Sequence, residues 1–422
     1  MFPDAQNFAV GLSPPLTVGH PAMTDQTHLT PTAYHREVRD YLRENERDLW
    51  AWFATEQRKE NYAEELRDSL LKSTYRLSSA DHPDLYQQLT TALGALGLEI
   101  PVTLYQAQTG PAQPNATLFH LPSEAHIVLS GPIVSLLAPV EWVAVFGHEL
   151  AHRLLWQVDD GDYLIADRIL EATANDPRAR SAHVETARRY RLHTEIFADR
   201  GALRAAGDLP QTVSALVKIS TGLSVSRGES YLTQAAEIFA KGEVRTAALS
   251  HPEMFMRTHA LALWAEGNDS ADTALRPMIA GEISADNLDL LDQRRLSELT
   301  RRFLAQLLRP AWFRSDAVLA QARLYFADFV PGESDDGSLL ADLTAQRELL
   351  SSYFAYVLLD FVNVDPDLDQ LPLASTLRWA EDLRILPGFE KLLSKDLGIK
   401  GRDLVKLKPK LAELLGQPAP AP

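Results

Sequence analysis

The sequence predicts an α+β fold that is predominantly α-helical, on three observations. The chain of 422 residues is 45% hydrophobic and 23% charged, which suits globular cores and, at this length, two or three domains. Apolar residues recur at helical spacing over most of the chain. The stretch around residues 100–130 instead has the short apolar runs of strands, so we expect one small β-sheet.

The chain is expected to begin with a loose arm followed by helices. Residues 1–30 are rich in Pro, Thr and Gly, which predicts a flexible N-terminal arm. Helical spacing runs over about 31–71. A second helix over 83–96 ends at Gly97, the residue type that most often terminates helices.

The predicted sheet contains a hairpin. Residues 100–105 read as a first strand. Two short apolar runs, 116–120 and 125–130, follow and are separated by the four residues 121–124. Two runs joined in this way predict antiparallel strands.

A buried helix is expected over 139–157, because Pro139 is favoured at a first helical position and the following residues are mostly apolar. A shorter helix over 162–174 precedes a long one over about 183–206, which Gly207 closes. Further helices are expected over 210–220, 230–241, 252–265, 284–308 and 315–330.

The helices divide into two regions after the arm. A domain over 31–265 contains the sheet, and the polar, turn-forming residues after it mark the start of a helical C-terminal region over 266–415. Residues 331–338 are a candidate sub-boundary within that region, and residues 416–422 are expected to form a frayed tail.

Composition excludes several classes of partner and site. The chain has 41 basic and 57 acidic residues and a formal net charge of −16, which repels nucleic acid and anionic membrane surfaces. No stretch is long and apolar enough for a membrane span, and the first residues are a poor secretory signal, so we expect a cytoplasmic protein. Because the chain has no cysteine, any metal would be held by nitrogen and oxygen ligands.

Two histidines of the buried 139–157 helix have the spacing of metal ligands, and a glutamate lies next to one of them. His148 and His152 are four residues apart and share a helix face, so both imidazoles can reach one ion, and Glu149 projects beside them. Buried His and Glu are costly unless they are paired or bind a metal. The alternative is two core histidines that bond to carbonyls, with Glu149 in a salt bridge.

A third ligand is available from the 183–206 helix. A catalytic zinc ion takes three protein ligands and leaves one position open, and Glu195 would complete the set. Asp199 is one turn further on the same face and could accept the free ring N–H of a ligand histidine. The alternatives are a surface glutamate at Glu195 and a pair between Asp199 and the adjacent Arg200.

These motifs resemble the M48 family of zinc metallopeptidases, which includes the prenyl-protein proteases and the HtpX-like peptidases. The similar segments occur in the family's order over about 98–265, at 114–116, 126–131, 141–152, 195–199, 215–218 and 250–257. The resemblance implies a zincin-like catalytic core of the gluzincin type with one zinc ion. It implies His148, His152 and Glu195 as zinc ligands, Glu149 as catalytic base and Asp199 as the support of a ligand.

The resemblance also implies that His251 and Arg257 lie close to the metal cleft. Either could donate a hydrogen bond to the oxyanion that develops during hydrolysis. His251 could equally occupy the open metal position, or simply cap the helix expected to begin at residue 252.

The strands supply a candidate substrate site. An exposed strand edge beside the metal can pair with an extended polypeptide. The candidate substrate-binding residues are Asn115, Ala116, His126, Ile127 and Val128. If residues 1–30 or the C-terminal helices cover this edge, the site would be latent until they are displaced.

The sequence therefore predicts a cytoplasmic zinc endopeptidase that hydrolyses peptide bonds with a zinc-activated water and Glu149 as general base. One alternative is a metal-stabilised interaction protein with an idle peptidase core, whose helical region over 266–415 binds a protein partner. Another is a zinc hydrolase that acts on a non-peptide amide.

Overall fold

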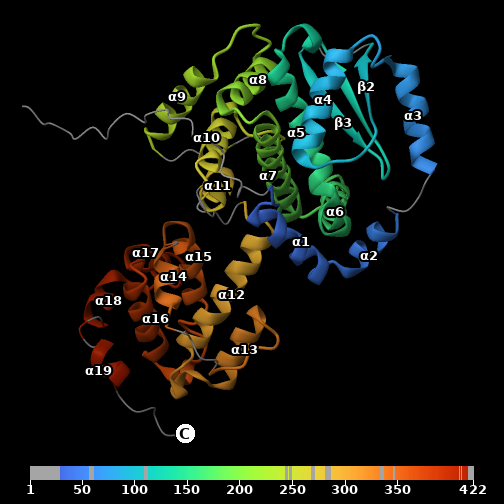
Figure 1. The fold of residues 1–422 in the computed structure, drawn as a ribbon. Coiled ribbons are helices and arrows are strands. Elements are labelled where there is room, and N and C mark those ends of the chain that lie inside the picture. The colour runs from blue at the N-terminus through green and yellow to red at the C-terminus, as the bar shows by residue number, and fades with distance from the viewer. Residues whose placement is uncertain are drawn as a thin grey trace, which may run out of the picture.

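A computed structural model describes most of the chain as two bodies joined by one helix (Figure 1). The N-terminal body contains the sheet and the helices up to α11, and the C-terminal body is helical. The described residues are 29–56, 61–108, 113–242, 246, 250–267, 271–280, 287–332, 337–345, 347–407, 409 and 411–416. The expectation of a predominantly helical α+β fold with a small sheet is confirmed.

The sheet has four strands in the order β1-β2-β4-β3 and is mixed. The strands are β1 (Thr74–Leu77), β2 (Val102–Ala107), β3 (Asn115–His120) and β4 (Ala125–Ser130). The predicted hairpin is confirmed, since β3 and β4 pair antiparallel, while β2 pairs parallel with β4 and antiparallel with β1. Strand β1 was not predicted, because its four residues directly follow a helix without a turn signal.

Strand β4 lies inside the sheet, which corrects part of the predicted substrate site. It pairs with β2 on one side and with β3 on the other. His126, Ile127 and Val128 are therefore buried and have no free backbone edge to offer a substrate. The sheet edge formed by this hairpin is β3, where Asn115 and Ala116 lie. The sequence could not show which hairpin strand would pair with β2.

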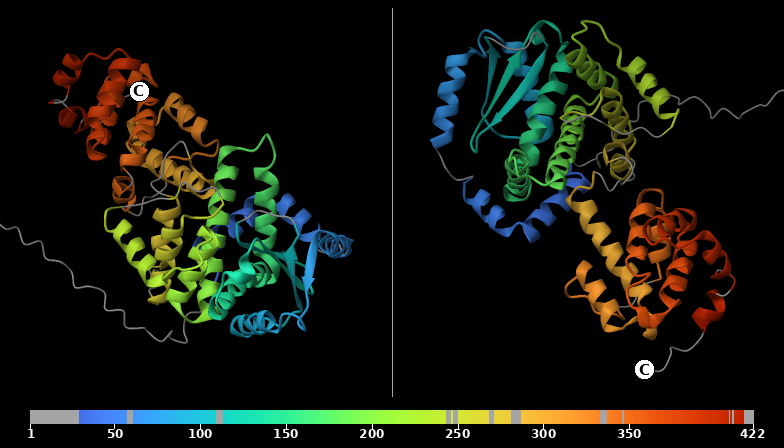
Figure 2. Two further views of the ribbon diagram at one scale, coloured as in Figure 1. Left: turned by 90° about the horizontal axis from the view of Figure 1, so that it is seen from above. Right: turned by 180° about the vertical axis from the view of Figure 1, so that it is seen from behind.

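Helices cover both faces of the sheet and continue beyond it (Figure 2). Leu104 and Ile127 pack with helices α4 and α5 on one face, and Tyr105 and Val128 pack with α3 on the other. The helices of the N-terminal body are α1 (Ala33–Asn45), α2 (Arg47–Glu56), α3 (Asn61–Ser73), α4 (Pro83–Leu96), α5 (Pro139–Gln157), α6 (Asp162–Ala174), α7 (Ser181–Ala206), α8 (Leu209–Thr221), α9 (Gly228–Phe239), α10 (Met254–Ala265) and α11 (Ala271–Ala280).

The C-terminal body has its own hydrophobic core, which corrects the predicted boundaries. Leu275 and Ile279 of α11 pack against α7 and α10, so the chain does not leave the N-terminal body at residue 266. The second core instead runs from Leu299 to Leu407 on both sides of 331–338, so that segment separates no cores. Its helices are α12 (Leu290–Leu307), α13 (Asp316–Tyr325), α14 (Leu339–Ala345), α15 (Arg347–Leu359), α16 (Leu371–Asp382), α17 (Leu386–Asp396), α18 (Gly401–Leu407) and α19 (Leu411–Gly416).

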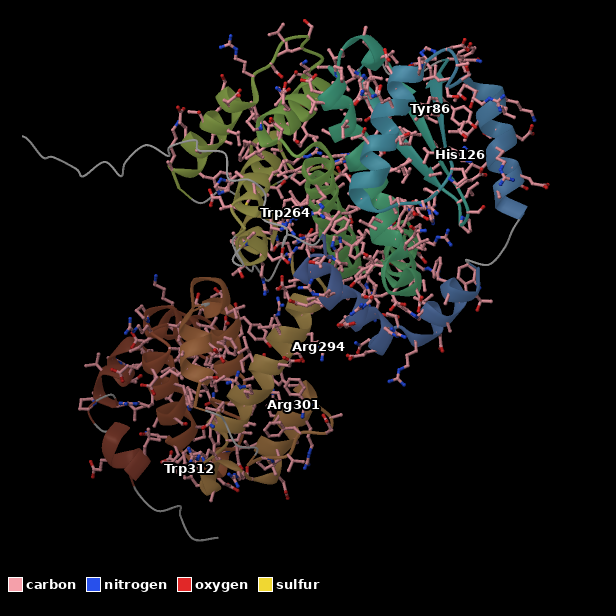
Figure 3. All side chains as sticks on the ribbon, in the orientation of Figure 1. Tyr86, His126, Trp264, Arg294, Arg301 and Trp312 are labelled. Atoms are coloured by element: carbon pink, nitrogen blue, oxygen red, sulfur yellow. The ribbon has the colours of Figure 1, made fainter. Side chains whose placement is uncertain are left out.

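Helix α12 joins the two bodies, as the labelled arginines in Figure 3 illustrate. Arg294 lies 3.4 Å from Glu44 of α1, and Arg301 bonds to Asp328 of the C-terminal body at 2.6 Å. Residues 1–28 of the arm predicted over 1–30, and residues 417–422 of the tail predicted over 416–422, lie outside the described residues. Among the residues that are described, no helix combines the length and apolarity needed to cross a bilayer.

Candidate metal centre

Helices α5 and α7 approach each other closely at two glycines. A Cβ atom on Gly147 would lie 2.5 Å from the Cβ of Ala205, and one on Gly201 would overlap Ala151. Each helix thus presents two small residues four positions apart, which lets the backbones meet beside His148. The close packing of α5 against α7 was not predicted, although small residues four positions apart are visible in both segments of the sequence.

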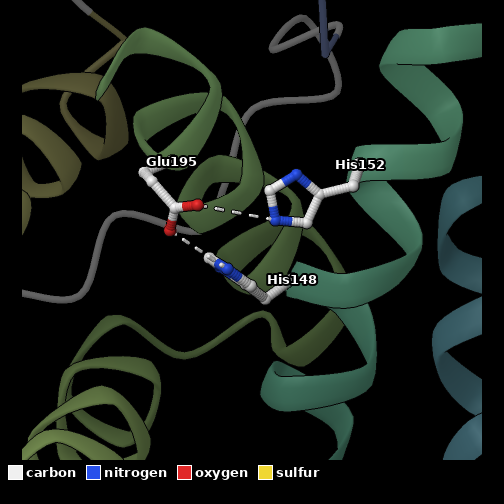
Figure 4. A group of neighbouring side chains, drawn as sticks. All are labelled: His148, His152 and Glu195. Carbon is white, nitrogen blue, oxygen red and sulfur yellow. Dashed lines mark ion pairs between the residues drawn. The ribbon is translucent and has the colours of Figure 1, made fainter. Parts of the chain in front are cut away.

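The close helix pair brings the three predicted ligands together (Figure 4). His148 and His152 project from α5 toward Glu195 of α7. Their Nε2 atoms lie 3.6 and 3.9 Å from the two carboxylate oxygens of Glu195. One ligand atom from each residue lies within 4.8 Å of the others, so the group could hold a metal ion.

Asp199 orients one of these ligands. Its carboxylate lies 3.1 Å from Nδ1 of His148, which leaves Nε2 of that ring facing Glu195. Arg257 donates two hydrogen bonds to the same carboxylate, at 2.8 and 2.5 Å. The alternative pair between Asp199 and Arg200 is wrong, because Arg200 bonds to Asp272 instead.

Burial and neighbouring charges shift the pKa values of the three candidate ligands in different directions. Burial alone would lower the pKa of His148, but the carboxylates of Asp199 and Glu195 outweigh it and raise that pKa to about 10. Burial lowers the pKa of His152 to about 4. Burial acts to raise the pKa of Glu195, yet the two imidazoles hold it well below its usual range. Carboxylates that retain a proton on His148 would also attract a divalent cation.

The donor set fits zinc. Bonds of about 2.05 Å at tetrahedral angles put neighbouring ligand atoms about 3.3 Å apart, close to the spacing of the imidazole and carboxylate atoms. Oε2 of Glu195 is buried and has no hydrogen-bond partner. Coordination to a bound ion would compensate for the missing hydrogen bond. The partners found for His148 are carboxylates rather than the carbonyls of the alternative interpretation.

Glu149 lies beside the three ligands with 7% of its surface exposed. Burial raises its pKa to about 7, against the lowering effects of His148, the backbone amide of Leu118 and other neighbours. Since Leu118 belongs to β3, the carboxylate of Glu149 lies between the metal-binding helix and the edge of the sheet.

A cleft of about 1000 Å³ runs past this group. Its walls come from β3, from helices α5 to α8 and from the segment before and within α10. Asn115 and Ala116 line it together with the metal group, whereas His126 does not. The cleft is therefore bounded along one side by the free edge of β3.

His251 and Arg257 both line the cleft but differ in their contacts. The side chain of His251 is 61% exposed, and its Nε2 lies 3.6 Å from Oε2 of Glu195. The helix-cap alternative for His251 is wrong, because α10 begins at Met254 and Glu253 is its N-cap residue. The side chain of Arg257 is 11% exposed and is engaged with Asp199, so its contacts make it a support of that carboxylate.

Comparison with models of protein families, with curated proteins and with solved structures found no match for this chain. The resemblance to M48 peptidases therefore stays a prediction. What is established is a buried His148, His152 and Glu195 group that could bind a metal ion, at the wall of a large cleft.

Proposed function

We propose that this protein is a zinc-dependent endopeptidase with a gluzincin-type core similar to that of M48 peptidases. The observation that carries the proposal is the convergence of His148, His152 and Glu195 from two helices, with Glu149 alongside and a free strand edge next to it. A metal that served structure alone would need neither the acid nor the cleft.

Each side chain has a distinct part in hydrolysis. Bound by the three ligands, zinc would act as a Lewis acid that activates water and polarises the scissile carbonyl. Glu149 would accept a proton from the attacking water and pass it to the leaving amine. In the metal-free site burial raises the pKa of this carboxyl to about 7, which suits a group that both takes up and releases a proton.

The edge of β3 supports a polypeptide as the substrate. An extended peptide can add to this edge by main-chain hydrogen bonds, which places its carbonyls along the cleft that contains Glu149. His251 is exposed near Glu195, with its Nδ1 3.0 Å from the hydroxyl of Ser250, and its Nε2 would donate to the oxyanion of a bound peptide. Arg257 would act indirectly, through Asp199 and His148.

The direct test combines metal analysis with peptide hydrolysis. Wild-type protein is expected to bind about one zinc ion and to cleave casein or a flexible fluorogenic peptide. Glu149→Gln should retain the metal and lose about 10² to 10⁴ of the turnover, because the general base is removed. His148→Ala should lose the metal. A matched control is His82→Ala, since His82 lies outside the cleft. Wild-type protein that cannot be loaded with zinc would refute the proposal.

One observation favours a second candidate, a metal-stabilised interaction protein. The C-terminal body has its own core, and none of its described residues lines the cleft. Such a body could bind a protein partner while the peptidase core is idle. Under this candidate, zinc-loaded wild type would hydrolyse no peptide, and Glu149→Gln would match wild type in every assay.

A further inference from the structure

Arg153 is a buried charge that the proposed mechanism does not use. It follows His152 on α5 and its side chain is fully buried. Within the described residues it contacts no carboxylate, and its Nε has no hydrogen-bond partner. Burying a guanidinium without an acid is costly, so the contacts it does make need an explanation.

The guanidinium of Arg153 fills the turn between β3 and β4. Its terminal nitrogens donate to the carbonyl oxygens of Leu121, Pro122 and Glu124 at 2.6, 2.9 and 3.1 Å. One of them also lies 2.6 Å from Nδ1 of His120, the last residue of β3. A single side chain of the metal-binding helix thus fixes the end of the strand that borders the cleft.

The opposite end of β3 is attached to another wall of the cleft. Gln113 donates from Nε2 to the carbonyl oxygen of Ser220 in α8 at 3.0 Å. A Cβ atom on Gly131 would lie 2.8 Å from the carbonyl oxygen of Gln113, so the start of β3 also packs closely. Between these attachments lies Leu118, whose amide faces Glu149.

We propose that Arg153 is a positioning residue that sets the distance between the edge of β3 and the metal-binding face of α5. This inference rests on the proposed function. A shift of the strand would move the bound peptide relative to His148 and His152, and would also withdraw the amide of Leu118 from Glu149. A displacement of about 1 Å at a reacting centre can cost about 100-fold in rate.

A purely structural role for Arg153 makes a different prediction. The variant would then lose stability, but its folded, zinc-loaded fraction would keep the kcat and KM of wild type. The two roles are separated by kinetic constants normalised to bound zinc, combined with hydrogen exchange of β3 in zinc-free protein.

The experiment compares Arg153→Met and Arg153→Lys with the control Arg314→Met. Arg314 also donates to backbone carbonyls, those of Leu308 and Arg309, but lies in the C-terminal body. Lysine at position 153 keeps the charge and can reach some of the same carbonyls. It also provides a folded variant if Arg153→Met does not fold.

For Arg153→Met we expect kcat/KM per zinc to fall at least about tenfold with a higher KM, while the zinc affinity stays within about twofold. The backbone amides of residues 115–120 should exchange about tenfold faster. Arg153→Lys should be intermediate in both readouts, and Arg314→Met should match wild type in both.

Unchanged exchange in residues 115–120 would overturn the inference, as would faster exchange with unchanged kinetics per zinc. A parallel loss of zinc affinity in both Arg153 variants would also overturn it, because the ligands rather than the strand would then have moved. Wild-type protein that binds zinc but cleaves no peptide would refute the proposed function and with it the catalytic role of Arg153. Faster exchange in the variants would then still identify it as the anchor of β3.

Discussion

Replacing Asp199 with asparagine should separate support of the metal from support of the fold. Asp199 is 1% exposed and accepts hydrogen bonds from His148 and from Arg257. Asparagine has nearly the same shape but no charge. The substitution keeps one acceptor oxygen but replaces the other with an NH2 group, so His148 and Arg257 can no longer both be satisfied, and Arg257 loses its closest counter-charge.

Two effects follow, and their magnitudes differ. Mutation of a ligand's hydrogen-bond partner typically lowers metal affinity by about 10 to 100-fold, or about 1.4 to 2.8 kcal/mol. Breaking a buried ion pair costs about 3 to 5 kcal/mol of folding free energy. We expect the lower end of that range, because Glu195 lies 3.9 Å from Arg257 and retains part of the compensation.

The assay measures zinc affinity by competition with a chelator, and stability by urea unfolding of zinc-free protein. The matched control is Asp272→Asn, which removes the counter-charge of the neighbouring buried arginine, Arg200, without touching a ligand. Asp272→Asn should lose stability and keep the zinc affinity of wild type within about twofold. Equal losses of affinity in both variants, or none in Asp199→Asn, would refute the assignment of Asp199 as the support of His148.

Three further predictions concern residues that pack around the metal group. Gly201→Ala should push α5 away from α7 at Ala151, and should therefore lower both the melting temperature and the zinc affinity measured by chelator competition. Lys218→Met should leave the buried Glu141 without its cation and cost about 3 kcal/mol in urea unfolding, whereas a Glu141→Gln, Lys218→Met double variant should recover part of the loss. Burial and an adjacent guanidinium lower the pKa of His120 to about 4, below its unfolded value of 6.5, so its contribution to stability is full above pH 6.5 and is lost as the pH falls toward 4. The loss at pH 5 is at most about 2 kcal/mol, and a His120→Gln variant with the same pH dependence of urea unfolding as wild type would contradict this account.

Local signals predicted the helices that carry the site. The 139–157 helix was bounded correctly because Pro139 fixes its start, and the 162–174 helix was also predicted with the observed bounds. The spacing of His148 and His152 required no knowledge of the fold, since residues four apart on a helix always share a face. That Glu195 reaches them was an inference from metal chemistry, and the ligand atoms do converge.

Predictions failed where the outcome depends on contacts between distant segments. The pairing of β4 with β2 buries His126, although nothing within the hairpin distinguishes its inner strand from its outer one. Helix α11 packs on α7 although a turn-forming stretch precedes it, so the turn was mistaken for a domain boundary. Arg153 was not singled out, because an arginine in a helix gives no local sign that it will bond to a turn about thirty residues earlier.

The charges of the centre explain how so many ionisable groups can be buried together. Glu195 and Asp199 contribute two negative charges, and without a metal Arg257 and the protonated His148 balance them. A divalent cation that replaced the proton of His148 would leave one excess positive charge, which an ionised Glu149 would cancel. The charge of Arg257 therefore allows the site to be neutral both without a metal and with a divalent cation bound. Without its charge, the metal-free cluster would carry a buried net negative charge, and its ligands would separate unless a cation was bound.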